Sequence, residues 1–349
     1  MTASDETISD ALLRWYNTHA RDLPWRSPPG APPPDPYRVW LSEVMLQQTM
    51  VAAVKPYFAK FIAAYPDVER LAAAPEAEIM AAWAGLGYYS RARNLIRCAR
   101  EVAALGAFPK TESELRKLPG LGAYTAAAIA AIAFGQRAVV VDANVERVVS
   151  RLFAIATPLP KSRPIIREHT DAITPQQHSG DFAQAMMDLG SGLCTTRKPK
   201  CLLCPLSPQC HARQGGDPER YPVKFPKKAK PVRHGTAYWI ERDENVWLTT
   251  RGGTGLLAGM RALPDDGWNA KNDGNTPPPV SGNWRDCGVV KHVFTHVALT
   301  LKVRRTEACE NDITGTGEWW PIADIDAAGL PTLFAKAARL ALADRGTDD

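Results

Sequence analysis

The feature that most constrains this chain is a glycine turn, LPGLG at residues 118–122, which is followed at once by the small-residue segment AYTAAAIAAIAFG. So short a turn between two helices, which we expect over 111–117 and 123–134, needs glycine for positive φ and for close approach of the backbone. The free amides at the start of the second helix, beside Gly120 and Gly122, would form an anion site that suits a DNA phosphate. On this stretch alone, an ordinary helix–turn–helix in a bundle is the alternative.

The hydrophobic pattern divides the 349 residues into two parts. Helical periodicity dominates up to residue 213 and predicts an all-α domain over 1–213. One helix begins at an Asp35-Pro36 cap and carries VWLSEVMLQQTMVAAV. The other helices are expected over 8–18, 67–74, 76–84, 90–105, 111–117, 123–134, 142–155, 162–173 and 179–190.

The pattern changes after residue 213. Residues 214–234 are rich in Pro, Gly and Lys, which is the composition of a linker. The segment TAYWIERDENVWLTTR then predicts two strands around an Asp-Glu-Asn turn, and KHVFTHVALTLKVRR alternates over a long run. The end of the chain, 331–345, has a helical pattern. Residues 235–349 are therefore expected to form an α+β domain.

The charge distribution favours a polyanionic partner. The net charge is only +5, but basic side chains gather in clusters, which is typical of a nucleic-acid-binding surface. These clusters are Arg91, Arg93, Arg97 and Arg100; Arg197, Lys198 and Lys200; and Lys224, Lys227, Lys228 and Lys230. No apolar run reaches membrane-spanning length, and the N-terminus lacks the basic flank and apolar core of a signal peptide. We expect a cytoplasmic protein without a membrane partner, and a monomer, because nothing indicates a coiled coil.

Four of the seven cysteines fall within seventeen residues: Cys194, Cys201, Cys204 and Cys210. In a cytosolic chain such clustering indicates a metal site rather than disulfides. Four thiolates can hold either one [4Fe–4S] cluster or one zinc ion. Zinc sites more often contain two C-x2-4-C pairs, and here only Cys201 and Cys204 form one, so the spacing favours iron–sulfur.

Two carboxylates stand in segments that could carry catalysis. Asp142 follows the apolar run AVVV and precedes a helix, where an ordinary N-cap is the alternative. Glu43 lies on a helix among Trp, Met and Leu and shares a face with Gln47. Burial there would disfavour its charge, and a neutral carboxyl near pH 7 can donate a proton. An exposed helical Glu is the alternative.

The blocks that carry these residues resemble the MutY-type adenine DNA glycosylases of the helix–hairpin–helix, endonuclease III superfamily. They are RDLPWR (21–26), SEVMLQQT (42–49), GLGYYSRARNL (85–95), LPGLGAYT (118–125), VDANVERV (141–148), FAQAMMDLG (182–190) and the cysteine loop over 194–210. Together they span nearly the whole first domain. One departure is Ala143, where most relatives carry glycine.

The resemblance implies a role for each matching residue. Glu43 would protonate N7 of a flipped adenine, and ionised Asp142 would stabilise the oxocarbenium-like sugar, as paired carboxylates do in glycoside hydrolysis. Tyr124 and Asn144 would orient these carboxylates and the attacking water. The adenine pocket would include Trp25, Arg26 and Gln184; Gln48 and Tyr88 would insert beside the partner base; and the four cysteines would bind a [4Fe–4S] cluster.

Tyr124 separates two reaction types within this superfamily. Bifunctional relatives carry a lysine at this position, whose amine forms a Schiff base with the sugar and cleaves the strand. A phenol cannot form an imine. The sequence therefore predicts a monofunctional glycosylase that stops at the abasic site.

The second domain resembles the Nudix-like C-terminal domain of the same family, which implies recognition of 8-oxoguanine opposite adenine. Phe294, Thr295 and His296 match the loop that reads this base, although an alternating strand segment would give the same pattern. No Nudix hydrolase box is present, which favours binding without hydrolysis. The stretch GTGLLAGMRALP (253–264) departs from the family, with Arg261 and Ala262 in place of Trp and its neighbour.

The expected substrate is therefore double-stranded DNA with adenine opposite 8-oxoguanine or guanine, in base excision repair at the nucleoid. An endonuclease III-like pyrimidine glycosylase/lyase is the nearest alternative, and Tyr124 argues against it. A DNA-binding module or redox sensor that uses the cluster alone is a second alternative. A Nudix nucleotide hydrolase is a third, and it lacks the motif.

Overall fold

The computed structural model describes residues 6–226, 229–252, 255–307 and 313–345. The chain forms two compact units, which are described separately. One unit comprises Met1–Ala82 and Ser90–Pro226, and the other Trp83–Tyr89 and Lys227–Asp349. In the described part of the chain, no helix has the length and apolar character needed to cross a membrane. Lys227 and Lys228, which belong to the third basic cluster, lie outside the described residues.

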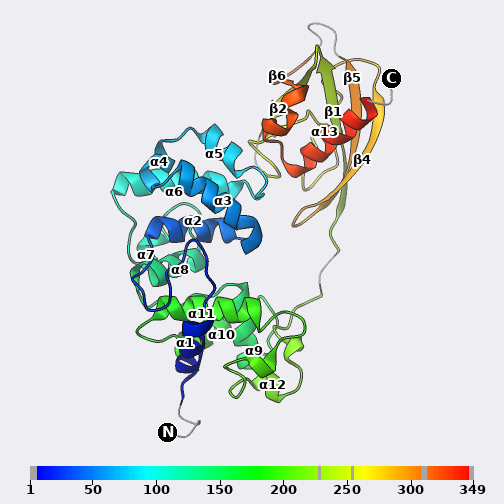
Figure 1. The fold of residues 1–349 in the computed structure, drawn as a ribbon. Helices are drawn as coiled ribbons and strands as arrows, with labels where there is room; N and C mark the ends of the chain where they lie inside the picture. The colour runs from blue at the N-terminus through cyan, green and yellow to red at the C-terminus, as the bar shows by residue number, and fades with distance from the viewer. Residues whose placement is uncertain (1–5, 227–228, 253–254, 308–312, 346–349) are drawn as a thin grey trace. The chain divides into compact units, whose positions relative to one another are not determined.

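The first unit is all helical (Figure 1), as the sequence predicts. Its α-helices are α1 (Ile8–His19), α2 (Pro36–Leu46), α3 (Val51–Ala64), α4 (Val68–Ala73), α5 (Glu76–Trp83), α6 (Ser90–Leu105), α7 (Glu112–Leu115), α8 (Ala123–Phe134), α9 (Ala143–Leu152), α10 (Arg163–Ile173), α11 (Ser179–Gly192) and α12 (His211–Gln214). Short 3-10 helices cover Cys201–Leu203 and Pro218–Arg220.

Helix α8 is the centre of this unit. Its residues 125–133 are all buried, and it packs against α2, α7 and α11. The small side chains permit a close approach, because a Cβ built on Gly180 of α11 would lie 2.5 Å from the carbonyl oxygen of Ala131. The alanine-rich sequence therefore serves packing on several sides at once.

One predicted helix is wrong. The segment VWLSEVMLQQTMVAAV is not continuous, because α2 ends at Leu46 and α3 begins at Val51. Between them Gln48 takes a left-handed backbone conformation with φ of 58°. The carbonyls at the end of α2 are bonded by a side chain of another helix, Arg91 of α6, and not by the next helical turn. Gln47 consequently lies at the C-cap of α2 rather than on the helix face that carries Glu43.

The second unit is α+β, as predicted. Its strands are β1 (Val232–Arg242), β2 (Asn245–Thr250), β3 (Arg261–Ala262), β4 (Arg285–Val293), β5 (Ala298–Glu307) and β6 (Glu318–Pro321). The sheet order is β3-β2-β1-β5-β4, with β6 also paired to β2. Strands β1 and β5 are parallel and the other pairs are antiparallel. Asp243 and Glu244, both at positive φ, form the two-residue turn between β1 and β2.

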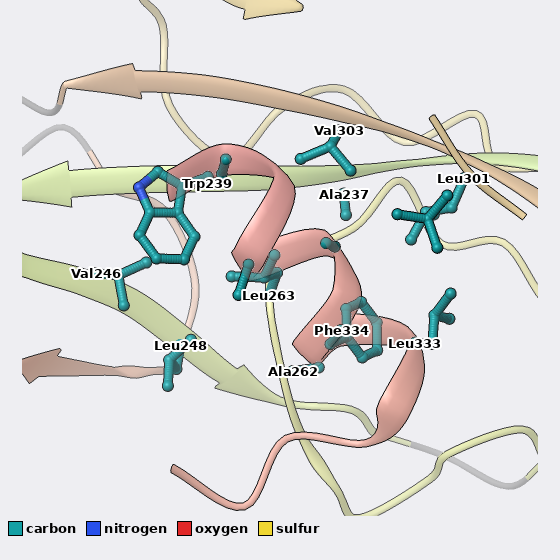
Figure 2. Close-up of a cluster of buried hydrophobic side chains, with 14 of the residues drawn as sticks. Ala237, Trp239, Val246, Leu248, Ala262, Leu263, Leu301, Val303, Leu333 and Phe334 are labelled. Carbon is teal, nitrogen blue, oxygen red and sulfur yellow. The ribbon is translucent and has the colours of Figure 1, made fainter. Parts of the chain in front are cut away.

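Helix α13 (Thr332–Arg345) packs on this sheet against β4 and β5 (Figure 1). Figure 2 shows Leu333 and Phe334 of α13 within the main core of the unit, together with Leu263 and Leu301. A 3-10 helix over Ile322–Ala328 precedes α13.

The alternating run KHVFTHVALTLKVRR forms two strands, not one. It contains the end of β4, a turn over 294–297 and most of β5, and the amide of Phe294 donates to the Val297 carbonyl at 2.8 Å. The turn lacks glycine, so it left no signal in the alternation. Strands β3 and β6 were likewise too short to detect.

Arg261, at the departure from the family pattern, has its own partners. Its guanidinium lies 4.3 Å from the centre of the Trp320 ring and forms an ion pair of 2.8 Å with Glu318. It also donates to the Ala328 carbonyl at 2.7 Å. Arg261 thus joins β3 to the segment around β6. Residues 253–254 of the same stretch lie outside the described residues.

Candidate active site and cysteine loop

A cavity of about 1040 Å³ in the helical unit is lined by residues of α2, α8, α9, α11 and the loops beside them. It brings together eight of the residues predicted from the sequence: Trp25, Arg26, Glu43, Gln48, Tyr124, Asp142, Asn144 and Gln184. Gly120, Gly122, Tyr88 and the loop over 294–296 do not line it.

Glu43 projects from the buried face of α2 and is 5% exposed. The Tyr124 hydroxyl donates to its Oε2 at 2.6 Å. Burial raises the pKa of Glu43 to about 7; the Tyr124 hydrogen bond opposes this, and the negative charge of Asp142 adds to it. Glu43 is thus protonated over a range in which an ordinary carboxyl is ionised.

Asp142 is the N-cap of α9, so its position follows from the start of that helix. Its Oδ1 accepts from the Val145 amide at 2.7 Å, and its Oδ2 accepts from the Asn144 side chain at 2.8 Å. Burial is the largest effect and raises the pKa of Asp142, and these two donors and the Arg147 charge offset part of this rise. A helix N-terminus with several donors favours the charged form. Asp142 is both an N-cap and a cavity residue.

One wall of the cavity contains Arg21 and Arg26, which pair with a carboxylate that the sequence analysis missed. Arg26 donates to Asp188 of α11 at 2.8 Å, and Arg21 bonds the other oxygen of this carboxylate at 2.6 Å. Asp188 is 3% exposed. Its signal was a carboxylate inside the apolar block FAQAMMDLG, which is acceptable only with a cationic partner. Through Asp188, α11 holds Arg26 at the cavity.

Gln184 and Trp25 complete this wall. Gln184 of α11 is 4% exposed, and its Oε1 is buried with no hydrogen-bond partner among the described residues. A buried amide oxygen without a partner is costly, and here it lines a cavity where a ligand donor can satisfy it. Trp25 is 4% exposed and packs edge-on against Phe58.

The glycine turn fits the expectation at Gly120 but not at Gly122. Gly120 has a φ of 77°, and an added Cβ would lie 2.7 Å from the Asn94 Cβ, so both the conformation and the space require glycine. Gly122 is the N-cap of α8 with an ordinary φ of −79°. No atom lies within 4 Å of a Cβ built there. The N-terminus of α8 therefore opens onto free space.

The four clustered cysteines line one small cavity with Arg151 and Arg213. Burial raises the pKa of the Cys204 thiol to about 12, and the neighbouring cysteines add to this shift. Arg151 of α9 is 1% exposed and bonds Cys194 Sγ at 3.2 Å. Among the described residues, its guanidinium has no carboxylate within 4.0 Å. A buried cation beside four thiols fits an anionic metal–thiolate group.

No three His, Cys, Asp or Glu side chains in the described part of the chain converge as ligands of a single metal ion. The four thiols share a cavity without meeting at one point. The cysteine loop is also joined to the cavity that contains Asp142. Arg147 of α9 donates to the Cys194 carbonyl at 2.8 Å and to Asn144 Oδ1 at 2.9 Å.

In the second unit, the loop over 294–296 joins β4 to β5. Thr295 and His296 are exposed, whereas the Phe294 ring is half-buried against the core. The Phe294 ring centre lies 6.0 Å from that of Trp268 and 4.5 Å from that of His292. Phe294 thus anchors a loop that presents its two polar neighbours. Tyr88, in the segment 83–89, is 45% exposed and has a φ of 49°.

Comparisons with known proteins match a segment of each unit. Residues 41–175 match the HhH-GPD superfamily of base excision DNA repair proteins, and residues 235–340 match the NUDIX domain. The adenine DNA glycosylase of Buchnera aphidicola subsp. Baizongia pistaciae is 33% identical, over 93% of this chain and 94% of its own length. The human adenine DNA glycosylase is 34% identical, over 84% of this chain and 65% of its own.

Solved structures agree with this assignment for the helical unit. A thermostable thymine-DNA glycosylase matches with a TM-score of 0.53 and 32% identity, over 59% of this chain and 95% of its own. An endonuclease III trapped in a covalent intermediate with DNA matches with a TM-score of 0.51 and 25% identity, over 60% of this chain and 94% of its own.

Proposed function

Since this chain belongs to the family of adenine DNA glycosylases, we propose that it removes adenine opposite 8-oxoguanine or guanine by hydrolysis and stops at the abasic site. It is a DNA N-glycosylase of base excision repair, and the base it excises is adenine. The observation that carries the proposal is the Tyr124–Glu43 hydrogen bond of 2.6 Å in a cavity that also holds Asp142. We expect a monomer acting on cytoplasmic, nucleoid DNA.

The two carboxyls divide the chemistry. Neutral adenine is a poor leaving group, and protonation at N7 by Glu43 makes it a better one. With a pKa of about 7, about half of the Glu43 carboxyls carry a proton at neutral pH. As the glycosidic bond breaks, positive charge develops on the sugar, and the carboxylate of Asp142 stabilises it. Water then adds to the sugar with Glu43, now ionised, as the base.

Tyr124 and Asn144 hold the carboxyls in place. The Tyr124 hydroxyl fixes one oxygen of Glu43, so the other can face the base. The Asn144 amide bonds one oxygen of Asp142, and the Val145 amide bonds the other. Because position 124 carries a phenol, no imine with the sugar can form, and the strand stays intact.

The remaining cavity residues would recognise adenine. The unsatisfied Oε1 of Gln184 can accept from the exocyclic amine. Arg26, held by Asp188, can donate to a ring nitrogen, and Trp25 contributes an apolar wall.

A base in a duplex reaches this cavity only after flipping, and Gln48 and Tyr88 would fill the gap that it leaves. The amides beside Gly120 and Gly122 would bind the backbone phosphate.

The second unit would read the partner base. Thr295 and His296 carry hydrogen-bonding side chains in an exposed turn whose Phe294 is packed on the core. 8-Oxoguanine differs from guanine at N7 and C8, where it presents a new N–H and a carbonyl. A hydroxyl and an imidazole can bond such groups. This assignment also gives the Nudix-like unit a binding role.

We further propose that Cys194, Cys201, Cys204 and Cys210 hold a [4Fe–4S] cluster. When bound, the cluster would anchor the basic loop and offer negative charge to buried Arg151. A structural role that places Arg197, Lys198 and Lys200 for phosphate contact suits this loop better than electron transfer.

The test is single-turnover base release from duplexes with adenine opposite 8-oxoguanine, guanine or thymine, each split and read with and without alkali. We expect the fastest release opposite 8-oxoguanine, slower release opposite guanine, and strand breaks only after alkali. Strand breaks without alkali would instead indicate a lyase. Equal rates for the three partners would remove 8-oxoguanine recognition from the proposal.

A further inference from the structure

Arg91 of α6 is a buried arginine whose guanidinium is directed at the backbone of another helix. It is 8% exposed. Its Nη1 donates to the carbonyls of Val44 at 3.1 Å and Met45 at 2.8 Å, and also to the carbonyl of Gln47. Its Nη2 donates to the Thr49 hydroxyl at 3.0 Å. One side chain thus bonds both residues that flank Gln48.

The Arg91 hydrogen bonds take the place of the usual C-terminal cap of a helix. The last carbonyls of a helix lack intrahelical partners, and a glycine in the left-handed conformation commonly satisfies them. Helix α2 is followed by QQTM (47–50), which contains no glycine. A cation at its C-terminus satisfies the free carbonyls and complements the helix dipole. Gln48, with its φ of 58°, can therefore hold a conformation that non-glycine residues rarely adopt.

We propose that Arg91 is the positioning residue for Gln48, and that its bonds on both sides of this residue hold Gln48 in the conformation that enters the DNA stack. The inference rests on the proposed role of Gln48 as the side chain that fills the gap after flipping. Glu43 directly precedes Val44 and Met45 on α2, so the same bonds define where the loop starts relative to the cavity.

Arginine is required for this geometry. Its planar fork presents several N–H groups in fixed directions, so that Nη1 and Nη2 reach different partners at once. Lysine keeps the charge and the aliphatic stem but is a point donor. Arg91→Lys therefore removes the simultaneous hydrogen bonds to Gln47 and Thr49, on either side of Gln48, and keeps the charge and most of the packing.

The experiment measures flipping apart from chemistry. In the Glu43→Gln background, 2-aminopurine replaces adenine opposite 8-oxoguanine, and its fluorescence reports the flipped fraction. We expect Gln48→Ala and Arg91→Lys each to lower the flipping equilibrium about fivefold or more, the scale of one ordinary hydrogen bond. The double variant should be no worse than Gln48→Ala, because residues that act as a unit are not additive.

Three controls separate positioning from general damage. Arg70→Lys, at an exposed arginine of α4, should leave flipping unchanged. Thr49→Val removes one Arg91 contact while it leaves the cap on α2, and should lower flipping in the same direction but less. With Glu43 intact, Arg91→Lys should release adenine from a single-nucleotide bulge at the wild-type rate, since a bulge leaves no gap to fill.

The outcomes distinguish this inference from the function beneath it. If Gln48→Ala does not reduce flipping, the wedge role fails, and the inference about Arg91 fails with it. If Gln48→Ala reduces flipping but Arg91→Lys does not, or if the two effects add fully, only the inference is overturned. If Arg91→Lys slows adenine release equally from bulged and from paired substrates, Arg91 supports the whole site. That result also overturns the inference about Gln48.

Discussion

Glu43 and Asp142 are buried carboxyls that line the same cavity, and they differ in the hydrogen-bond donors around them. Glu43 lies within α2, and the Tyr124 hydroxyl donates a hydrogen bond to it. Asp142 lies at a helix N-terminus, where a backbone amide and the Asn144 side chain both donate to it. Donors favour the charged form, and burial with few donors favours the neutral form. The positions in α2 and α9 thus suit Glu43 to give a proton and Asp142 to carry charge.

Replacement of Glu43 by Gln removes the proton donor with little change in shape. We expect adenine release to fall by about a hundredfold or more, the lower range of general acid catalysis, while DNA affinity changes little. In the wild type, release should slow as pH rises through about 7, because the protonated form of Glu43 is then lost. Single-turnover rates over pH 5–9 and titration of a labelled duplex test this. A rate that stays flat through pH 7 would exclude Glu43 as the acid.

The same substitution should stabilise the protein at high pH. The pKa of Glu43 rises from 4.5 to about 7 on folding. A raised pKa means that its stability contribution is present below pH 4.5 and is lost as pH rises through 7. At about 1.36 kcal/mol per pH unit, the loss is about 3 kcal/mol at most. Glu43→Gln should therefore raise the Tm relative to the wild type at pH 8 and not at pH 4. A constant difference at both pH values would contradict the raised pKa.

Tyr124→Phe tests the hydrogen bond by itself. The Tyr124 hydroxyl lowers the pKa of Glu43 by donating to its charged form. Without it, the pH at which adenine release declines should move upward. The maximal rate should also fall about tenfold, because Glu43 loses its fixed orientation. The pH profile of single-turnover release measures both effects. An unchanged midpoint would show that the hydroxyl does not act on Glu43.

The residues that sequence reasoning found are those inside recognisable blocks, and eight of them line one cavity. Asp188 was missed, and Arg91 was assigned to a basic surface cluster, whereas the structure buries it against the end of α2. Their importance comes from partners distant in sequence, since Asp188 bonds Arg21 and Arg26, and Arg91 bonds the end of α2. No pattern within one segment records which buried charge meets which partner.

At the scale of elements, the sequence predicts helices better than their interruptions. Helices α8 and α11 were predicted because each is a long segment of small and apolar residues without proline, and both are buried along most of their length. The sequence did not predict the break between α2 and α3 or the turn over 294–297, because neither segment contains Gly or Pro. Both are held by contacts to other segments, Arg91 in the first case and the Trp268 side chain in the second. Tertiary contacts therefore determine where α2 and β4 end.

The glycine turn gives a matched pair of substitutions. Gly120→Ala places a Cβ 2.7 Å from the Asn94 Cβ at a φ of 77°, and should lower the free energy of unfolding by about 1–3 kcal/mol. Gly122→Ala meets no atom within 4 Å and should cost about 1 kcal/mol or less. If phosphate approaches this amide, Gly122→Ala should still weaken DNA binding by about tenfold. Denaturant melts and duplex titrations separate the two. Unchanged affinity in Gly122→Ala would exclude the phosphate contact.

Arg151 tests the link between α9 and the cysteine loop. Its guanidinium bonds the carbonyls of Thr195 at 2.7 Å and Thr196 at 3.0 Å as well as Cys194 Sγ. Arg151→Lys keeps the charge but cannot bond all of these at once. Iron should then be lost to a chelator about tenfold faster, the usual effect of removing an outer partner of a metal ligand. Iron and sulfide per chain, followed over time, measure this, with Arg70→Lys as control. Equal rates of loss would argue against a cluster beside Arg151.

For the whole molecule, we assign base removal to the first unit and recognition of the partner base to the second. Each carries the match to a different family, the first to base excision repair proteins and the second to the NUDIX domain. The helical unit holds Glu43, Tyr124, Asp142 and Asn144, to which we assign the chemistry, in one cavity. Adenine is a normal DNA base, so the decision to remove it has to depend on its partner. The second unit is where that information would be read.

Selectivity and catalysis should therefore separate by substitution. His296→Ala and Thr295→Ala remove exposed side chains from the turn after β4, while Phe294 keeps the turn packed on the core. We expect adenine release opposite 8-oxoguanine to slow by about tenfold per variant, the cost of one or two lost hydrogen bonds, and release opposite guanine to change little. The ratio of the two single-turnover rates is the measurement, and Lys271→Ala, in another loop of the unit, is the control. A parallel loss on both substrates would mean that the turn supports DNA binding in general, and an unchanged ratio would place recognition of 8-oxoguanine elsewhere in the chain.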